Sequence, residues 1–364
     1  MSYSGENQYF SFRDGFCESL PNVTLTSAVM SEFGRTLSGF FSRFCAGCCG
    51  FSHTPLLYAL CSGISECGHD VFVCENTDLP SFRFGIPLLS ADCGVFISGN
   101  GTVKISFFTN NKFPFSDSLL TRIMNGKPSE ISEKYGKITV STSFCNIYVN
   151  NIRDTAKGTD FPIKAGISCG NRAVRSIWLE FFSGEDEKLI FQISDDGMRV
   201  NAYSEKYGFI SFEKLTLAYS FMLAQSGKTV FLPQNFHYGA DISGENGKFS
   251  AVRFSPELKI PDEAVNQRFL NDPLFMCVQL TKNTDRFYSA LSQLPSISSA
   301  KRELAVNSID IMPLGKTINE DNGRIIISRS GKNRISLLAQ SLSAETASEI
   351  CSSWTEKLRE IDTN

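Results

Sequence analysis

The chain has 364 residues, of which 42% are hydrophobic and 20% charged. This composition is typical of a globular protein with more than one domain, since a domain usually takes about 100–200 residues. The formal net charge is −3 and no block of lysine or arginine occurs, so we expect neither nucleic acid nor a membrane as a partner. No apolar run is long enough to span a bilayer, and residues 1–6 lack the basic start and apolar core of a signal peptide. These features predict a cytoplasmic protein.

Twelve cysteines are many for such a chain, and half of them lie between Cys45 and Cys74. One interpretation is a metal or redox site with His53 and His69 as further members. The other is a set of reduced thiols that serve as small buried apolar residues. We favour the second interpretation, because the spacing follows the apolar pattern and no second Cys-x-x-Cys completes a tetrahedral set.

The first third of the chain alternates helical and strand patterns, which is typical of an α/β fold with a mostly parallel sheet. Pro55 suits the first turn of a helix, and Gly68 marks the end of that helix. The patterns predict helices over 26–44, 54–66 and 80–89 and strands over 70–74, 93–97 and 103–108.

The same alternation continues after a connection over 128–135. We expect strands over 163–167, 189–193, 229–232, 324–327 and 335–339, and helices over 171–182, 212–225 and 344–361, with mostly helix over 272–294.

The segment from Ala91 to Gly101 consists of a buried strand that ends in a Gly/Asn turn. In open α/β sheets, chemistry takes place just beyond the carboxyl ends of such strands. The segment resembles the active-site loop of the α-D-phosphohexomutases, the phosphoglucomutase/phosphomannomutase family, where Thr-Ala-Ser-His-Asn-Pro carries a phosphoserine. Asn100 stands at the position of that serine and Ser98 at the position of the threonine. An amide cannot be phosphorylated as a hydroxyl can, so the resemblance implies a lost nucleophile.

Two further strand ends carry the resemblance. The family's Gly-x-Asp-x-Arg pattern reads Gly47–Phe51 here, with Cys49 in place of the acid. The family's Asp-x-Asp-x-Asp-Arg loop, whose carboxylates hold magnesium, corresponds to the segment 194–199. Its three ligand positions are Ser194, Asp196 and Met198, Arg199 matches the arginine, and Asp195 is the other candidate metal ligand.

The last part of the resemblance is a phosphate loop, Arg-Pro-Ser-Gly-Thr-Glu-Pro in the family, which corresponds to the segment 328–333. Backbone amides of such a turn can hold an anion, and its cationic side chains can add charge-assisted hydrogen bonds. An ordinary solvated hairpin is the alternative, and both interpretations stay open. The candidate phosphate-binding residues are Arg329, Ser330, Gly331 and Lys332, with Arg199 as a further anion ligand or a surface ion-pair partner.

The resemblance covers nearly the whole chain in order. It implies an α/β, phosphohexomutase-like fold. This fold would consist of three related α/β units, each with a mixed sheet, and a small α+β C-terminal domain. The second and third units would be abridged. The implied domains are 1–136, 137–208, 209–296 and 297–364, and the third lacks the family's sugar-recognition loop.

These substitutions predict a phosphohexomutase-like protein without catalytic activity or cofactor, which binds a sugar phosphate or a protein partner. The alternative is an active intramolecular phosphotransferase on hexose phosphates, with Ser98 as a relocated nucleophile and Mg²⁺ as its cofactor. A structural subunit with a vestigial cleft is a third possibility. We favour the inactive protein, because methionine is a poor ligand for a hard cation and in-line transfer tolerates little displacement.

Overall fold

The structure is a computed structural model that describes residues 11–13, 16–20, 24–99, 101–141, 143–186, 188–233, 236–240, 251–254, 267–308, 312–314, 317–331 and 333–363. The chain divides into two compact units. The first comprises Met1–Phe212 and Arg268–Asn283, and the second comprises Glu213–Gln267 and Thr284–Asn364. The first unit therefore includes a segment from the later part of the chain, Arg268–Asn283.

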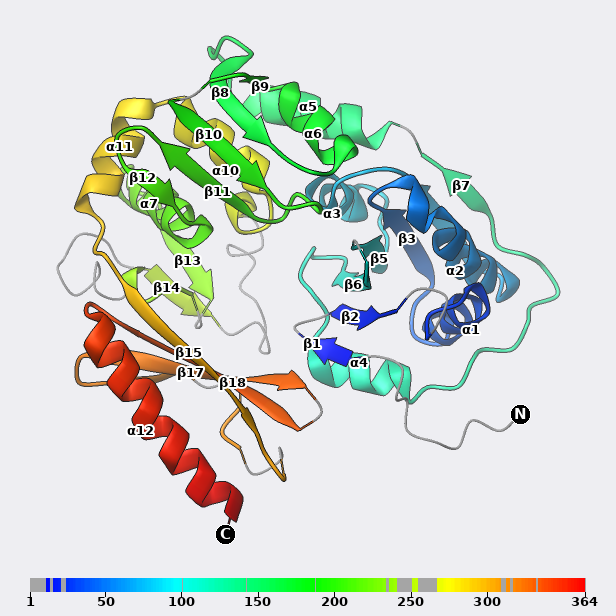
Figure 1. The fold of residues 1–364 in the computed structure, drawn as a ribbon. Helices are drawn as coiled ribbons and strands as arrows, with labels where there is room; N and C mark the ends of the chain where they lie inside the picture. Colours follow the sequence, from blue (N-terminus) through cyan, green and yellow to red (C-terminus); the bar gives the residue numbers. More distant parts are fainter. Residues whose placement is uncertain are drawn as a thin grey trace. The chain divides into compact units, whose positions relative to one another are not determined.

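A seven-stranded sheet organises the N-terminal part of the first unit (Figure 1). Its strands are β1 (Ser11–Arg13), β2 (Phe16–Ser19), β3 (Arg43–Cys48), β4 (Asp70–Cys74), β5 (Cys93–Ser98), β6 (Val103–Thr109) and β7 (Ile138–Val140). Its helices are α1 (Ser27–Ser38), η1 (Phe51–His53), α2 (Thr54–Glu66), α3 (Leu79–Leu88) and α4 (Asp117–Met124). The strand order is β1-β2-β6-β5-β3-β4-β7, in which β5, β3, β4 and β7 run parallel to one another and β6, β2 and β1 pair antiparallel.

The central parallel strands are buried on both faces. All six residues of β5 are buried, and so are five of the six residues of β3. Ala46 belongs to the apolar cluster that also holds residues of α1 and α2. On the other face, a Cβ at Gly47 would lie 2.7 Å from the Phe82 ring, and a Cβ at Gly94 would lie 2.5 Å from Ile86. Burial on both faces is typical of parallel sheets and explains the unbroken apolar runs of these strands.

Helices α1 and α2 approach each other through two glycines. A Cβ at Gly34 would lie 2.4 Å from the carbonyl oxygen of Leu60, and a Cβ at Gly63 would lie 1.9 Å from the carbonyl oxygen of Ser31. No side chain fits at such distances, so the spacing of the two helices depends on both glycines.

A five-stranded sheet forms the second part of the first unit. Its strands are β8 (Ile163–Ser168), β9 (Phe182–Gly184), β10 (Leu189–Ile193), β11 (Val200–Ser204) and β12 (Gly208–Ile210), in the order β12-β11-β10-β8-β9. The accompanying helices are α5 (Phe144–Thr155), α6 (Arg172–Leu179), η2 (Arg268–Leu270) and α10 (Pro273–Thr281). The rings of Trp178, Phe182 and Phe191 lie 5.1 Å to 6.0 Å apart in its core. Such aromatic contacts add to the stabilisation that burial provides.

The second unit contains a parallel strand pair and a four-stranded antiparallel sheet. Arg324 is buried in this sheet, where its guanidinium donates to Oε1 of Gln340 and to the carbonyl oxygen of Phe236. Leu358 of the last helix joins the apolar cluster of the sheet. The elements of this unit are α7 (Phe212–Gln225), β13 (Val230–Pro233), β14 (Ala251–Phe254), α11 (Thr284–Gln293), β15 (Ser298–Ala305), β16 (Thr317–Glu320), β17 (Gly323–Gly331), β18 (Arg334–Ser341) and α12 (Ala344–Thr363).

The mixed α/β fold expected from the sequence is confirmed, while several elements have other bounds than expected. The first helix ends at Ser38 instead of 44, because Gly39 caps it and β3 begins at Arg43. The helix expected over 171–182 ends at Leu179, and Phe182 begins β9. The helix expected over 272–294 is two helices that belong to different units. No helix in the described part of the chain combines the length and the apolarity that crossing a membrane requires.

The glycine contact between α1 and α2 can be tested with Gly63→Ala. Alanine gains about 1 kcal/mol of helix propensity, but its methyl group overlaps the Ser31 carbonyl and forces the helices apart. We expect the cost of overpacking to exceed the gain in helix propensity. The free energy of unfolding should fall by about 1–3 kcal/mol, and the melting temperature should fall with it. Ser62→Ala is the matched control, because Ser62 is the exposed neighbour and makes only an exposed hydrogen bond to Glu66. An unchanged melting temperature for Gly63→Ala would contradict the contact.

Candidate functional site

Cys49 joins three segments at the carboxyl end of β3. Its backbone N–H donates to the carbonyl oxygen of Ile97 in β5 at 3.0 Å. Its thiol donates to the carbonyl oxygen of Asp195 at 3.1 Å and accepts from Nδ2 of Asn171 at 3.1 Å. Burial, followed by the nearby carboxyl groups of Asp78 and Asp196, raises the pKa of this thiol and keeps its proton in place. The end of the first sheet is thus held against the β10–β11 turn of the second sheet.

The β10–β11 turn is closed by its own side chains. Oδ1 of Asp196 accepts from the Ser194 hydroxyl at 2.6 Å and from the backbone N–H of Met198 at 3.0 Å. The Ser194 hydroxyl oxygen in turn accepts from the backbone N–H of Arg199 at 2.9 Å. Aspartate and serine commonly stabilise turns in this way. One carboxylate oxygen of Asp196 and the hydroxyl of Ser194 are therefore engaged within the turn.

Met198 faces a buried cation. Nη1 of Arg83 lies 3.9 Å from Sδ of Met198, and the guanidinium carbon lies 4.9 Å from the centre of the Phe108 ring. Nε of Arg83 donates to the carbonyl oxygen of Lys112 at 2.8 Å, and Nη2 donates to the same oxygen and to Oδ1 of Asn271. Burial lowers the pKa of Arg83 to about 9, against the opposite effect of Asp272. Even so, the guanidinium remains charged at neutral pH.

Asp78 is a fully buried carboxyl group beside the same turn. It caps α3 through Oδ1, which accepts from the backbone N–H of Ser81 at 3.0 Å and from the Ser81 hydroxyl. Oδ2 has no hydrogen-bond partner among the described residues, and it would lie 3.4 Å from a Cβ at Gly197. Burial raises the pKa of Asp78 to about 7, although the hydrogen bonds from Ser81 act in the opposite direction.

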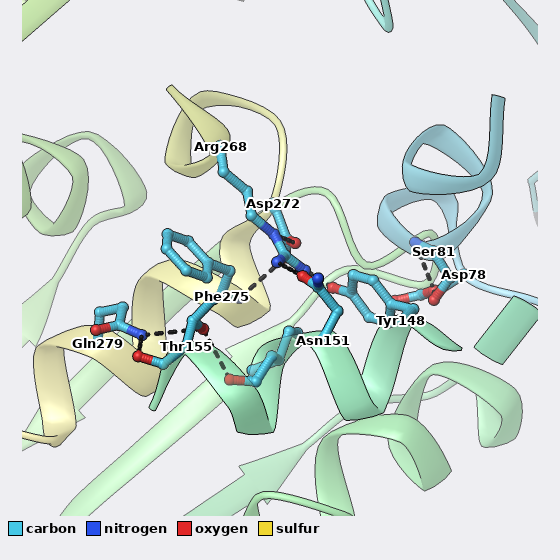
Figure 2. A network of polar contacts seen from close by, with 10 residues as sticks. Asp78, Ser81, Tyr148, Asn151, Thr155, Arg268, Asp272, Phe275 and Gln279 are labelled. Carbon is cyan, nitrogen blue, oxygen red and sulfur yellow. Dashed lines mark hydrogen bonds and ion pairs between the residues drawn. The ribbon is translucent and has the colours of Figure 1, made fainter. Parts of the chain in front are cut away.

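A second buried network lies between α5 and α10 (Figure 2). Oδ1 of Asp272 accepts from the Tyr148 hydroxyl at 2.7 Å, and Oδ2 accepts from Nε of Arg268 at 2.6 Å. Arg268 also donates to Asn151 and lies over the ring of Phe275. The hydrogen bonds that Tyr148 and Asn151 of α5 make with Asp272 and Arg268 hold the segment 268–283 in the first unit.

Ser98 is the last residue of β5 and pairs with Lys104 of β6, with 4% of its surface exposed. The side chains of Asp195 and Arg199 are exposed on the β10–β11 turn. Asn100 lies outside the described residues. Ser98 and the turn are thus brought together through Cys49, whereas the predicted nucleophile position itself is not described.

The candidate phosphate loop is the β17–β18 connection of the second unit. The backbone pairs Arg329 with Ile335 and Gly331 with Arg334, and the register shifts between the first and second pair. Lys332 and the side chains of Arg329 and Ser330 lie outside the described residues. The anion-binding role of Arg329, Ser330, Gly331 and Lys332 stays a prediction.

Sequence reasoning missed Asp78 and Arg83 as members of this neighbourhood. A helix-capping signal was present, because Asp78 precedes Pro80 and Ser81 at the start of α3. No local pattern could have indicated Arg83, since its partner Met198 is 115 positions away in the chain.

The donor set of the turn does not match magnesium. Mg²⁺ prefers six oxygen ligands, usually from carboxylates, phosphate and water. Met198 offers a thioether beside a guanidinium, and Ser194 uses its hydroxyl within the turn. Among the described residues, no three His, Cys, Asp or Glu side chains converge as a metal site. Asp195 and Asp196 as cation ligands stay a prediction.

The fold of the chain is phosphohexomutase-like. A phosphoglucomutase/phosphomannomutase family protein from Burkholderia thailandensis is similar at a TM-score of 0.69 and 14% identity, over 96% of this chain and 97% of that chain. N-acetylphosphoglucosamine mutase from Aspergillus fumigatus, in complex with GlcNAc-6P and magnesium, is similar at a TM-score of 0.53 and 9% identity. The similarity covers 99% of this chain and 97% of that chain. Neither protein-family models nor curated sequences match the chain.

The buried carboxyl group of Asp78 predicts a pH-dependent stability. In the unfolded chain the carboxyl ionises near 3.8, whereas in the folded protein it keeps its proton up to about pH 7. The folded state binds more protons between these values, so the free energy of unfolding falls as the pH rises from about 4 to about 7. We expect Asp78→Asn, which keeps the Oδ1 acceptor for Ser81, to melt higher than the parent protein at about pH 8 and to lose this advantage below pH 5.

Asp70→Asn is the matched control, because the exposed Asp70 carboxylate also accepts one backbone N–H, from Lys137 at 2.7 Å. Thermal melting across this pH range measures the effect. A constant difference between Asp78→Asn and the parent protein at all pH values would contradict the buried, protonated carboxyl group.

Proposed function

We propose that this chain is a phosphohexomutase-like protein that binds a sugar phosphate without mutase turnover. The observation that carries the proposal is the β10–β11 turn, where Asp196 and Ser194 hydrogen-bond each other and Met198 faces Arg83. The Ser194 hydroxyl and one carboxylate oxygen of Asp196, at the position of the family's metal loop, have partners within the turn.

Electrostatics supports the lack of a magnesium-dependent step. The Arg83 guanidinium lies 3.9 Å from the third ligand position, and a divalent cation beside it would be repelled. A phosphoryl transfer depends on such a cation to neutralise charge between the phosphate oxygens.

The burial of Ser98 argues against the alternative of an active enzyme with a relocated nucleophile. A nucleophile must come within about 3–3.5 Å of the phosphorus in line with the leaving group. Ser98 is 4% exposed and is still paired with Lys104 as the last residue of β5, so its hydroxyl would reach a substrate only if the end of β5 separated from β6.

The binding part of the proposal is supported by the fold and by the β17–β18 connection. The similar protein from Aspergillus fumigatus was determined with GlcNAc-6P. In this chain, Arg329, Ser330, Gly331 and Lys332 would hold the phosphate, with Arg199 as a further anion ligand. All twelve cysteines are free thiols, which supports a reducing compartment such as the cytoplasm. A protein partner stays a prediction from the sequence.

Calorimetric titration with glucose 1-phosphate, mannose 1-phosphate and GlcNAc-6P tests the proposal, together with a coupled assay for isomerisation in the presence of magnesium and a bisphosphate activator. We expect saturable binding of at least one ligand without added magnesium, and no isomerisation. Arg329→Ala should weaken binding by about tenfold or more, since a charge-assisted hydrogen bond contributes about 1.5–3 kcal/mol.

Arg302→Ala is the matched control, because it removes an exposed arginine from β15 of the same sheet. Isomerisation that disappears in Ser98→Ala would overturn the proposed inactivity. Failure of all three ligands to bind would overturn the proposed binding.

A further inference from the structure

The five-stranded sheet of the first unit has one face that is open to solvent. Buried and exposed residues alternate along β10 and β11, so that Phe191 and Ala202 are buried while Gln192 and Tyr203 are exposed. On the buried face the ring of Trp178 packs against Phe191. Since successive residues of a strand point to opposite faces, the exposed residues all belong to the other face, which we call the open face.

The open face carries a row of apolar side chains across β10, β11 and β12 (Figure 1). Tyr203 pairs with Ile190 on one side and with Phe209 on the other. Residues directly opposite each other in antiparallel strands lie on the same face, with their side chains in contact distance. Tyr203 is 52% exposed and Phe209 is 64% exposed, although aromatic side chains gain much from burial. Two neighbouring exposed rings offer a flat surface on which a ligand can stack.

A row of polar side chains runs beside the apolar row. Gln192 pairs with Asn201 in β11 and with Ser168 in β8. These residues lie two positions along their strands from the apolar row, which corresponds to about 7 Å. Oδ1 of Asn201 accepts from the backbone N–H of Phe212 at 3.1 Å, which leaves its Nδ2 group to donate. Gln192 and Ser168 are exposed, so the row offers donors and acceptors without a charge.

The two rows and Ala202 line a shallow hollow of about 200 Å³. All of its lining residues belong to the first unit, and none of them is charged. A pocket that encloses a drug-sized ligand usually measures about 300–1,000 Å³, so this hollow is suited to a smaller group that lies flat on the sheet. Such a group must have one apolar side for the rings and neutral polar atoms beside it.

We propose that the open face binds a neutral saccharide, one pyranose residue of which occupies the hollow. The C–H groups of a pyranose form an apolar face, and its hydroxyl groups project from the edge of the ring. The apolar face stacks on Tyr203 and Phe209. The hydroxyl groups, which both donate and accept, reach the polar row of Ser168, Gln192 and Asn201. Neighbouring sugar residues of the chain extend beyond the hollow over the sheet.

This surface is separate from the sugar-phosphate site proposed above and does not depend on it. The phosphate ligands proposed there are residues 329–332 of the second unit and Arg199 of the β10–β11 turn, and none of them lines the hollow. A neutral saccharide needs no cationic ligand. Binding to the open face should therefore persist in Arg329→Ala, and sugar-phosphate binding should persist when the aromatic row is changed.

Saturation-transfer difference NMR of the full chain with maltoheptaose, cellohexaose and chitohexaose as separate probes tests the proposal. We expect saturation transfer to the ring C–H protons of at least one probe, and a titration that saturates. Tyr203→Thr and Phe209→Thr should each weaken this binding by about fivefold or more, because each removes one stacking ring. Threonine preserves the strand propensity of both positions.

Tyr135→Thr is the matched control, because Tyr135 is 77% exposed and lies in the connection before β7, outside the five-stranded sheet. It should bind the probes as the parent protein does. Thermal melting checks the fold of each variant.

Hydroxyl-radical footprinting of the parent protein decides the site even where a threonine variant melts early. The bound probe should protect Tyr203 and Phe209 from oxidation and leave Tyr135 unprotected. Failure of all three probes to bind, an equal loss of binding in Tyr135→Thr, or protection of Tyr135 in place of Tyr203 would each overturn the proposal. A dimer in analytical ultracentrifugation that Tyr203→Thr abolishes would overturn it too, because a second copy of the chain would then cover the open face.

Discussion

The arrangement of the candidate site depends on one thiol, that of Cys49. Its hydrogen bonds to Asp195 and Asn171 hold the second sheet against the end of the first. A carboxylate at this position, as the family pattern has it, would add a negative charge beside the carboxyl groups of Asp78 and Asp196. The neutral thiol removes that repulsion and can donate and accept at once. Hydrogen bonds of this one side chain therefore join the ends of the two sheets.

The charged and titratable side chains around Cys49 also have partners within the protein or are kept neutral by burial. Asp196 is satisfied within its turn, Arg83 is satisfied by carbonyl and amide oxygens, and Asp78 is buried as an acid that gives up its proton only near neutrality. Hydrogen-bonded polar groups of this kind rigidify their surroundings, while Oδ2 of Asp78 stays without a partner among the described residues. A neighbourhood of this kind is suited to holding a fixed shape.

The sequence was sufficient for the central strand β5, because it is buried on both faces and reads as an unbroken apolar run, and for β4 and β6, the strands that precede and follow it in the chain. It could not reveal that Phe182 leaves a helix to begin β9, since an apolar residue fits both patterns equally. The contact of Arg83 with Met198 depends on tertiary packing, which leaves no local signal.

The segment 268–283 belongs to the first unit, although both of its sequence neighbours belong to the second. Autonomous folding of the N-terminal two thirds therefore requires a piece encoded much later. A fragment that stops at Phe212 would lack α10 and leave the Tyr148 hydroxyl without Asp272 in a site built to exclude water. During synthesis the first unit must wait for its last helix, so its final packing is coupled to the emergence of the second unit from the ribosome.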